Sequence, residues 1–101
     1  MTYKISILAD AEKDLDKAYI WYELQQLNLG IRFYTIVEES IKFITNNPLC
    51  SQEIYKETRR YVIKKFPYGI YYKINSERNE IQIIGILHFK RRTSILKKRI
   101  I

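Results

Sequence analysis

The sequence is poor in the residues that build disulfides, metal sites and phosphate loops. Of its 101 residues, one is cysteine (Cys50), one is histidine (His88) and three are glycine. A lone cysteine cannot form an internal disulfide, and one cysteine with one histidine cannot close a zinc site. The glycines, at positions 30, 69 and 85, are isolated, which excludes a glycine-rich phosphate loop. We therefore expect no metal and no cofactor.

Long apolar runs are absent as well. No stretch approaches the roughly 20 apolar residues of a membrane span, and Met1–Ile5 lacks the basic cap and apolar run of a secretion signal. With the lone cysteine, this favours a reducing cytoplasm and no membrane partner. A chain of this length with 47% hydrophobic residues is expected to form a single domain, residues 1–101, around one core.

Acidic residues are scarce in the second part of the chain. Residues 1–58 contain six Lys/Arg and nine Asp/Glu, whereas residues 59–101 contain twelve Lys/Arg and two Asp/Glu. The formal net charge of +7 is thus concentrated after position 58. The basic residues there are interleaved with tyrosine and phenylalanine in strand-forming runs, as a surface for a polyanion would need. Nucleic acid, or an assembly that contains it, is the expected class of target.

The first part of the chain has the pattern of a strand followed by two helices. Residues 3–8 alternate as in a short strand. Asp10 is placed to cap a helix over residues 11–27, and Asn28 with Gly30 is expected to break the chain. A second helix follows, which Asn-Asn-Pro at 46–48 ends. Its apolar positions recur three or four apart: Phe33, Ile36, Val37, Ser40, Ile41 and Ile44.

After residue 54 the period changes to that of strands. Residues 59–66, 68–74 and 80–89 predict an antiparallel meander, with a polar hairpin loop at 75–79. The last of these strands is almost continuously apolar, as a strand covered on both sides would be. The expected fold is α+β: an N-terminal strand and a two-helix hairpin packed on a twisted antiparallel sheet of three to four strands. We expect the other sheet face to be free.

His88 lies at the predicted end of the last strand. Imidazole changes its protonation state near neutral pH without help, so His88 is a candidate general acid or base. The alternative is structural: a histidine that bonds a neighbouring backbone group or fills space at the sheet edge. Three basic residues follow closely: Lys90, Arg91 and Arg92.

Basic residues on the first strand of the meander are candidates for binding phosphate. Arg59 and Arg60 are adjacent, so at most one of them joins the free face. A guanidinium binds phosphate bidentately and can stabilise a phosphoryl-transfer transition state. Lys64 and Lys65 are subject to the same alternation. The alternative is that these are solvated charges at a sheet edge, which discourage aggregation.

Aromatic residues offer a second mode of binding. Tyr68, Tyr71 and Tyr72 could stack on exposed bases, at roughly 1–3 kcal/mol per base. Packing within the sheet is the alternative. Trp21 and Tyr22, on the first predicted helix, are core residues or line a groove for a partner.

Several short motifs follow one another along the chain: Trp21-Tyr22, Leu29-Gly30 with Phe33, Asn47-Pro48, Arg59-Arg60, Phe66-Pro67-Tyr68 with Ile70-Tyr71-Tyr72, and His88 with Arg91. Their order resembles the RelE/ParE-like toxins of bacterial type II toxin–antitoxin modules, nearer the ParE-like side. The resemblance implies a helical hairpin on a twisted antiparallel sheet, a growth-arresting activity, and a hetero-oligomer with an antitoxin encoded beside the toxin. It covers about residues 5–92.

This superfamily has two activities on one fold. RelE-like members cut messenger RNA in the ribosome, whereas ParE-like members poison DNA gyrase and are not nucleases. Phe66-Pro67-Tyr68 and the His88/Arg91 spacing look ParE-like, although Arg92-Thr93-Ser94 replaces the usual acidic-proline ending. A RelE-like activity would assign catalysis to His88, Arg91 and Arg59. Binding of nucleic acid or target would fall to Arg60, Lys64, Lys65, Tyr68, Tyr71, Lys90 and Arg92.

A third alternative is a non-toxic nucleic-acid-binding domain of the same fold. A basic sheet with aromatic residues would serve that role equally well. Harmless overexpression without any antitoxin would favour it.

Overall fold

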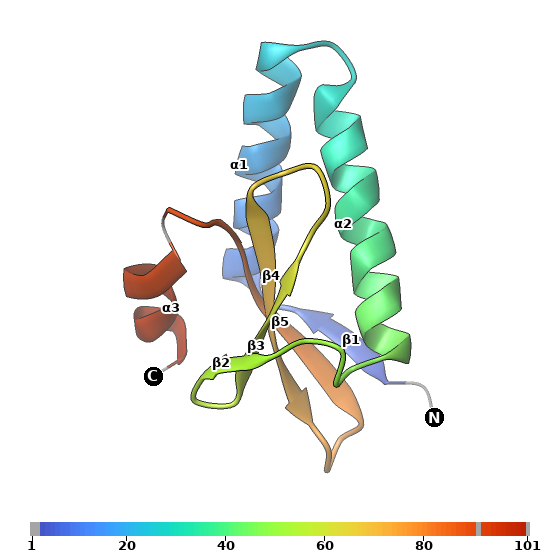
Figure 1. The fold of residues 1–101 in the computed structure, drawn as a ribbon, viewed down its shortest axis with the longest axis vertical. Helices are drawn as coiled ribbons and strands as arrows, with labels where there is room; N and C mark the ends of the chain where they lie inside the picture. The colour runs from blue at the N-terminus through green and yellow to red at the C-terminus, as the bar shows by residue number, and fades with distance from the viewer. Residues whose placement is uncertain (1–2, 91, 101) are drawn as a thin grey trace.

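The computed structural model describes residues 3–90 and 92–100, and it has the expected α+β architecture (Figure 1). An N-terminal strand leads into an antiparallel helical hairpin, which packs on a twisted sheet, and a short third helix follows the last strand. In chain order the elements are β1 (Lys4–Ile7), α1 (Ala9–Gln25), α2 (Leu29–Asn46), β2 (Glu53–Tyr55), β3 (Thr58–Val62), β4 (Tyr68–Asn75), β5 (Glu80–His88) and α3 (Arg92–Ile100).

The sheet has five strands in the order β1-β5-β4-β3-β2, one more than expected. The meander of β3, β4 and β5 is antiparallel as predicted, while β1 pairs with β5 in parallel. The extra strand, β2, is a three-residue edge strand beside β3. β5 lies between β1 and β4, so the prediction of an interior last strand is confirmed.

The helical hairpin covers one face of the sheet. The buried residues of α1 recur three or four apart (Ala11, Leu15, Ala18 and Tyr22), and α2 contributes Phe33, Val37 and Ile44. These side chains pack on the apolar face of the central strands, including Ile70, Tyr72, Ile83 and Ile86. Four rings form the contact between hairpin and sheet: Tyr22, Phe33, Phe66 and Tyr68, with centroids 4.8–6.0 Å apart.

Two predictions about helix ends were wrong. Leu8, not Asp10, is the N-cap of α1, and Asp10 lies in the first turn. Gly30 does not break the chain: it lies in the first turn of α2, where a Cβ would stand 2.5 Å from the carbonyl oxygen of Tyr19. The turn falls at Asn28, with φ 70°. The Glu23 carboxylate accepts hydrogen bonds from the backbone N–H groups of Asn28 and Gly30 and so caps α2.

The first strand of the meander is shorter than predicted. β3 ends at Val62, and residues 63–67 form a loop in which Lys65 has a positive φ of 71°. Phe66 leaves the sheet because its ring packs against Tyr22 and Phe33 of the hairpin. Strand alternation therefore does not place Lys64 and Lys65, which are exposed on the loop.

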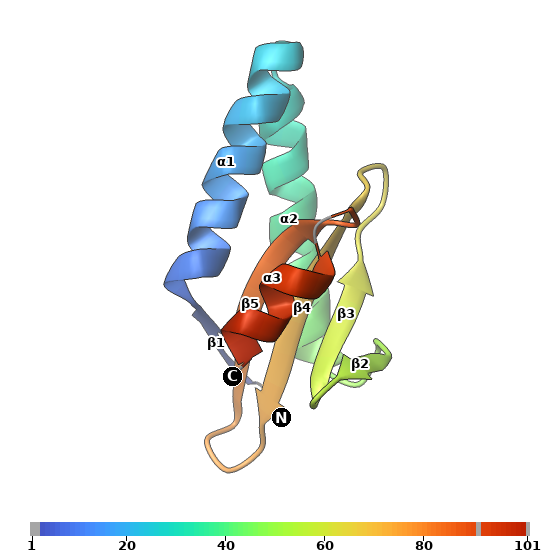
Figure 2. The same ribbon diagram turned by 90° about the vertical axis from the view of Figure 1, so that its left-hand side faces the viewer.

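The second sheet face is not free, contrary to the prediction. α3 lies across β4 and β5 on the side opposite the hairpin (Figure 2). Leu96 packs there with Tyr71, Ile84 and Leu87, and Ile95 lies at the margin of this cluster. The segment is short and mainly basic, so its few apolar residues gave little sign of a helix.

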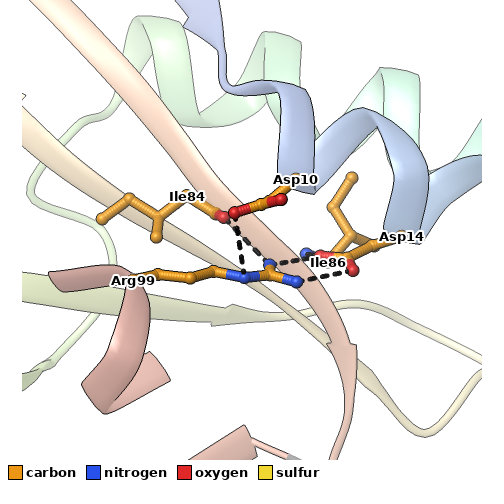
Figure 3. A network of polar contacts seen from close by, with 5 residues as sticks. All are labelled: Asp10, Asp14, Ile84, Ile86 and Arg99. Atoms are coloured by element: carbon orange, nitrogen blue, oxygen red, sulfur yellow. Dashed lines mark hydrogen bonds and ion pairs between the residues drawn. The ribbon is translucent and has the colours of Figure 1, made fainter. Parts of the chain in front are cut away.

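Arg99 fastens α3 to the rest of the molecule (Figure 3). Its guanidinium donates to both carboxylate oxygens of Asp14 at 2.6 and 2.9 Å, and to the carbonyl oxygen of Ile84 at 3.1 Å. Asp10 lies 3.8 Å from Nε of Arg99. The Asp14 carboxylate also accepts the N–H of Ile86 at 3.0 Å. One carboxylate and one guanidinium thus join α1, β5 and α3.

A bulge in β5 makes this arrangement possible. Tyr71 pairs with Gly85 but Tyr72 pairs with Ile83, so Ile84 is an extra residue in the ladder. A bulge turns backbone groups away from the partner strand, and here the freed carbonyl of Ile84 meets Arg99. A Cβ at Gly85 would lie 2.8 Å from Nη1 of Arg99, so glycine also leaves room for the guanidinium.

Replacement of Arg99 tests the clamp. The side chains of Arg99 and Asp14 are only 15% and 13% exposed, so Arg99→Met leaves a largely buried carboxylate without its cation. We expect this to lower the free energy of unfolding by about 2–4 kcal/mol. Urea denaturation measures the change. Lys98→Met on the exposed side of the same helix is the control and should cost under about 0.5 kcal/mol; equal losses would contradict a structural role for the pair.

Candidate functional site

His88 ends β5 and is partly buried beside the hairpin. Its ring meets the edge of Tyr68, with centroids 5.3 Å apart, and its Nδ1 accepts the backbone N–H of Lys90 at 3.1 Å. His88 thus accepts a neighbouring backbone N–H through Nδ1, as the structural alternative for this residue expects.

Arg59 and Arg60 lie on opposite faces of the sheet. Arg59 pairs with Tyr72, on the hairpin side, and its Nη1 donates to the carbonyl oxygen of Ser51 at 2.6 Å. Arg60 pairs with Tyr71, on the α3 side, and its guanidinium lies 6.0 Å from the ring centroid of Phe89. Of the two, only Arg60 lies on the side predicted to meet a polyanion.

Several of the remaining candidates gather at one end of the sheet. β3 and β5 are parallel to each other, so the loop after β3 and the segment after β5 lie at the same end, and the N–H of Phe89 donates to the carbonyl oxygen of Pro67. We call this region the basic end, defined by Arg60, Lys64, Lys65 and Lys90. Arg91 lies outside the described residues, as does the side chain of Arg92, which begins α3.

The three candidate stacking tyrosines differ in access, and Tyr72 is fully buried on the hairpin face. Tyr71 is fully buried beneath α3. Tyr68 is partly buried, between the aromatic core and His88. A base could reach Tyr71 only after α3 had moved, whereas Tyr68 faces a cleft.

That cleft was not predicted as a site. It has a volume of about 560 Å³ and lies between α1 and the end of β5. Trp21, which is 57% exposed, forms part of its wall, and Trp21 with Tyr22 was the signal in the sequence that pointed to a groove. Its lining comprises Asp14, Lys17, Ala18, Trp21, Tyr22, Pro67, Tyr68, Ile86, Leu87, His88 and Lys90.

A second cleft, of about 620 Å³, lies on the other side of the loop that follows β3. Ile31, Arg32 and Ile36 of α2 line it, opposite Lys65 and Phe66. Tyr22 and Pro67 border both clefts. The loop at residues 63–67 thus separates the two clefts. Among residues 3–90 and the described part of α3, no three His, Cys, Asp or Glu side chains are grouped so that they could hold a metal ion.

Within residues 3–90 and 92–100, no helix is long and apolar enough to cross a membrane.

Tyr72 is a structural rather than a reactive tyrosine. Its hydroxyl donates to the carbonyl oxygen of Pro48 at 2.8 Å, and burial, more than any other cause, raises its pKa to about 12. At neutral pH the phenol is fully protonated and cannot act as a base.

The raised pKa of Tyr72 gives a testable dependence on pH. A tyrosine that ionises near 10 when unfolded and near 12 when folded stabilises the fold below pH 10, and this contribution is lost as the pH rises from 10 to 12. Over this pH range, the free energy of unfolding of Tyr72→Phe should fall less steeply than that of the wild type. Urea denaturation at a series of pH values checks this, with Tyr55→Phe, at a partly buried edge position, as control. Parallel pH profiles for wild type and Tyr72→Phe would contradict the assignment.

Solved structures of bacterial toxins share this fold. A chromosomal ParDE system from P. aeruginosa matches with a TM-score of 0.73 at 17% identity, over 86% of this chain and 96% of that one. A mutant of the E. coli toxin RelE in the free state matches with a TM-score of 0.70 at 10% identity, over 99% and 96%. The RelBE2 toxin–antitoxin complex from Mycobacterium tuberculosis matches with a TM-score of 0.63 at 19% identity, over 87% and 99%. These similarities define the RelE/ParE toxin fold.

The amino-acid sequence identifies the family. The family model for the ParE toxin of the type II toxin–antitoxin system parDE matches residues 5–93. The chain therefore belongs to the ParE toxin family. No curated protein matches it in sequence.

Proposed function

We propose that this chain is a cytoplasmic, growth-arresting toxin that poisons DNA gyrase and is held inactive in a hetero-oligomer with an antitoxin encoded by the adjacent gene. Membership of the ParE toxin family supports the toxin class. One structural observation favours gyrase over RNA cleavage: the described candidates for catalysis, His88 and Arg59, lie far apart.

The sheet register gives the separation of His88 and Arg59. His88 pairs with Tyr68, whereas Arg59 pairs with Tyr72 on the opposite edge of the same strand. Four residues of strand separate those partners, roughly 13 Å. General acid–base catalysis requires its groups within about 3 Å of the reacting atoms. The Arg59 guanidinium is also bound to the carbonyl oxygen of Ser51.

The basic end is the proposed contact with gyrase or its DNA. Arg60, Lys64, Lys65 and Lys90 converge there from β3, its following loop and the segment after β5. Positive charge in this arrangement attracts a DNA backbone without reading its sequence. Arg92 and Tyr68 are proposed members of the same contact, whereas Tyr71, buried beneath α3, would support it only by packing.

A RelE-like ribonuclease is the second candidate, supported by the match of E. coli RelE to 99% of this chain. In that case His88 would be the acid or base, with Arg91 and Arg59 stabilising the charge on the phosphate. The ribosome with its messenger RNA would then be the target.

Induction of the chain in growing bacteria separates the candidates. We expect growth arrest with filamentation and gyrase-linked DNA breaks, while primer extension on an abundant transcript shows no new 5′ ends. New ends at in-frame codons would replace gyrase by the ribosome as the target. Unimpaired growth with folded protein would favour a non-toxic binding domain.

Neutralising the basic end should weaken toxicity. We expect the triple variant Lys64→Gln, Lys65→Gln, Lys90→Gln to need at least about tenfold more inducer for the same arrest, because each lost charge removes a backbone contact. The control removes three exposed lysines elsewhere: Lys4→Gln, Lys13→Gln and Lys42→Gln. Equal loss in both sets would make the effect one of net charge and not of this surface.

Single variants test His88, the last residue of β5, and Arg91, three positions later in the sequence. His88→Ala and Arg91→Ala are each expected to reduce toxicity, under either target. The measurement is colony formation after induction, with circular dichroism to confirm folding. A folded double variant that keeps full toxicity would remove both residues from the site.

A further inference from the structure

The second cleft, between the first two turns of α2 and the loop at residues 63–67, has an apolar lining that continues from the core. Leu29, Ile36 and Phe66 line it, and each is partly buried against the main core. Ile31, which is 50% exposed, also belongs to this lining. Ligand sites in proteins are typically hollows of about 300–1,000 Å³ with mainly apolar walls and a few polar groups. The volume of about 620 Å³ lies within that range.

Two cations border the same cleft from opposite walls. Arg32 comes from α2 and Lys65 from the loop, and both are exposed. Among the described residues that line the cleft, none is Asp or Glu. Within the part of the chain that the structure describes, neither cation has an ion-pair partner. The cleft therefore has uncompensated positive charge beside its apolar lining.

The loop holds Lys65 at the rim of the cleft. The ring of Phe66 packs against Tyr22 and Phe33, with centroids 4.8 and 5.1 Å apart, and this contact anchors the loop in the core. Lys65, the residue before it, has a φ of 71°, in the left-handed region that residues with a Cβ disfavour. Such a conformation persists where the surrounding structure imposes it, and it is common at ligand sites. The anchored Phe66 thus fixes the backbone of Lys65, while the lysine side chain stays exposed.

The helical periodicity places Arg32 one turn from the apolar lining. Arg32 and Ile36 are four positions apart in α2, so their side chains lie on one face of the helix. Thr35 borders the cleft as well, and its hydroxyl is a further donor. An anion bound by Arg32 and Thr35 would therefore have its apolar part beside Ile36 and Phe66.

We propose that this cleft binds an amphiphilic carboxylate, with the carboxylate at Arg32 and Lys65 and an aliphatic chain against Leu29, Ile36 and Phe66. A carboxylate accepts hydrogen bonds only, and a guanidinium matches it with two parallel N–H donors. Burial of the chain supplies affinity in proportion to the apolar area that is removed from water. The proposal concerns binding alone, and it holds whether or not the chain poisons gyrase.

The lining favours an aliphatic ligand over a nucleobase. Apart from Tyr22 and Phe66, its apolar side chains are aliphatic, and these two rings pack edge to face on each other, which leaves little of them for stacking on a base. The α1–β5 cleft differs in both respects, because it contains the carboxylate of Asp14 and the rings of Trp21 and Tyr68. An anion with an aliphatic chain therefore fits the cleft beside α2 better.

Decanoate, below its micelle-forming concentration, is the probe. In proton–nitrogen correlation spectra of the whole chain, we expect saturable shifts of the amides of Ile31, Thr35 and Lys65. The single indole N–H, of Trp21, reports on the α1–β5 cleft and should not move. Decanol and acetate, which lack the charge and the chain respectively, should each bind at least about fivefold more weakly. Decylammonium should give no saturable shift, because both cations repel it.

Matched variants test the two charges. Arg32→Gln should weaken decanoate binding at least about threefold, whereas Lys42→Gln, exposed on the same helix outside the cleft, should change it less than about twofold. The same contrast is expected between Lys65→Gln and Lys64→Gln, because Lys64 is the exposed neighbour of Lys65 and does not line the cleft.

A further pair tests the apolar lining. Ile31→Ala should weaken decanoate binding about threefold, because it removes apolar surface that the chain would cover. Ile20→Ala, which is 57% exposed on the same hairpin and lies outside both clefts, should leave binding unchanged. All the variants replace exposed side chains, and the same spectra show whether each variant is folded.

The site is supported by saturable shifts at the cleft that need both the chain and the negative charge, and that only the cleft variants weaken. Equal binding of decanoate and decylammonium would overturn it, since the two cations would then play no part. Equal effects of cleft and control variants would make the binding a general property of a basic surface. Shifts of the Trp21 indole without shifts of Ile31 and Thr35, or no saturable binding of decanoate, would also overturn the proposal.

Discussion

The structure depends on the burial of β5 from both sides. Its side chains alternate between the hairpin face, where Ile81, Ile83 and Ile86 lie, and the α3 face, where Ile84 and Leu87 lie. An interior strand that is apolar on both faces must be covered on both to remove that surface from water. The hairpin alone cannot do this, so the short basic helix α3 completes the core.

A short helix that packs on the sheet through Ile95 and Leu96 is weakly held by burial alone. Arg99 adds directional hydrogen bonds. Its guanidinium donates to the carboxylate of Asp14 in α1 and to the carbonyl oxygen of Ile84, which the bulge turns away from the partner strand. Asp14 in turn satisfies the N–H of Ile86. The bulge, which would otherwise leave polar backbone groups buried, is thus what fixes the position of α3 relative to α1.

The sequence predicted the elements whose periodicity is long and regular. The helical hairpin and the meander from β3 to β5 follow directly from apolar spacing. The covering of the second face does not follow from apolar spacing. It depends on a salt bridge between Asp14 and Arg99, which are 85 positions apart, and spacing gives no sign of such a contact. The prediction that Lys64 and Lys65 lie in a strand was wrong for a related reason. Phe66 packs against rings of the hairpin, and this contact ends the strand early. Among the candidate site residues, the gathering of lysines at one end was predictable only in composition, and the α1–β5 cleft only through Trp21 and Tyr22.

Lys90 is common to the α1–β5 cleft and the basic end. It lines the cleft with His88 and also stands at the basic end, because the chain leaves the sheet there. An acidic segment bound in the cleft would offset this charge and raise the free energy of any polyanion at the neighbouring lysines. A charged group in the cleft and a polyanion at the basic end would therefore influence each other through this one lysine.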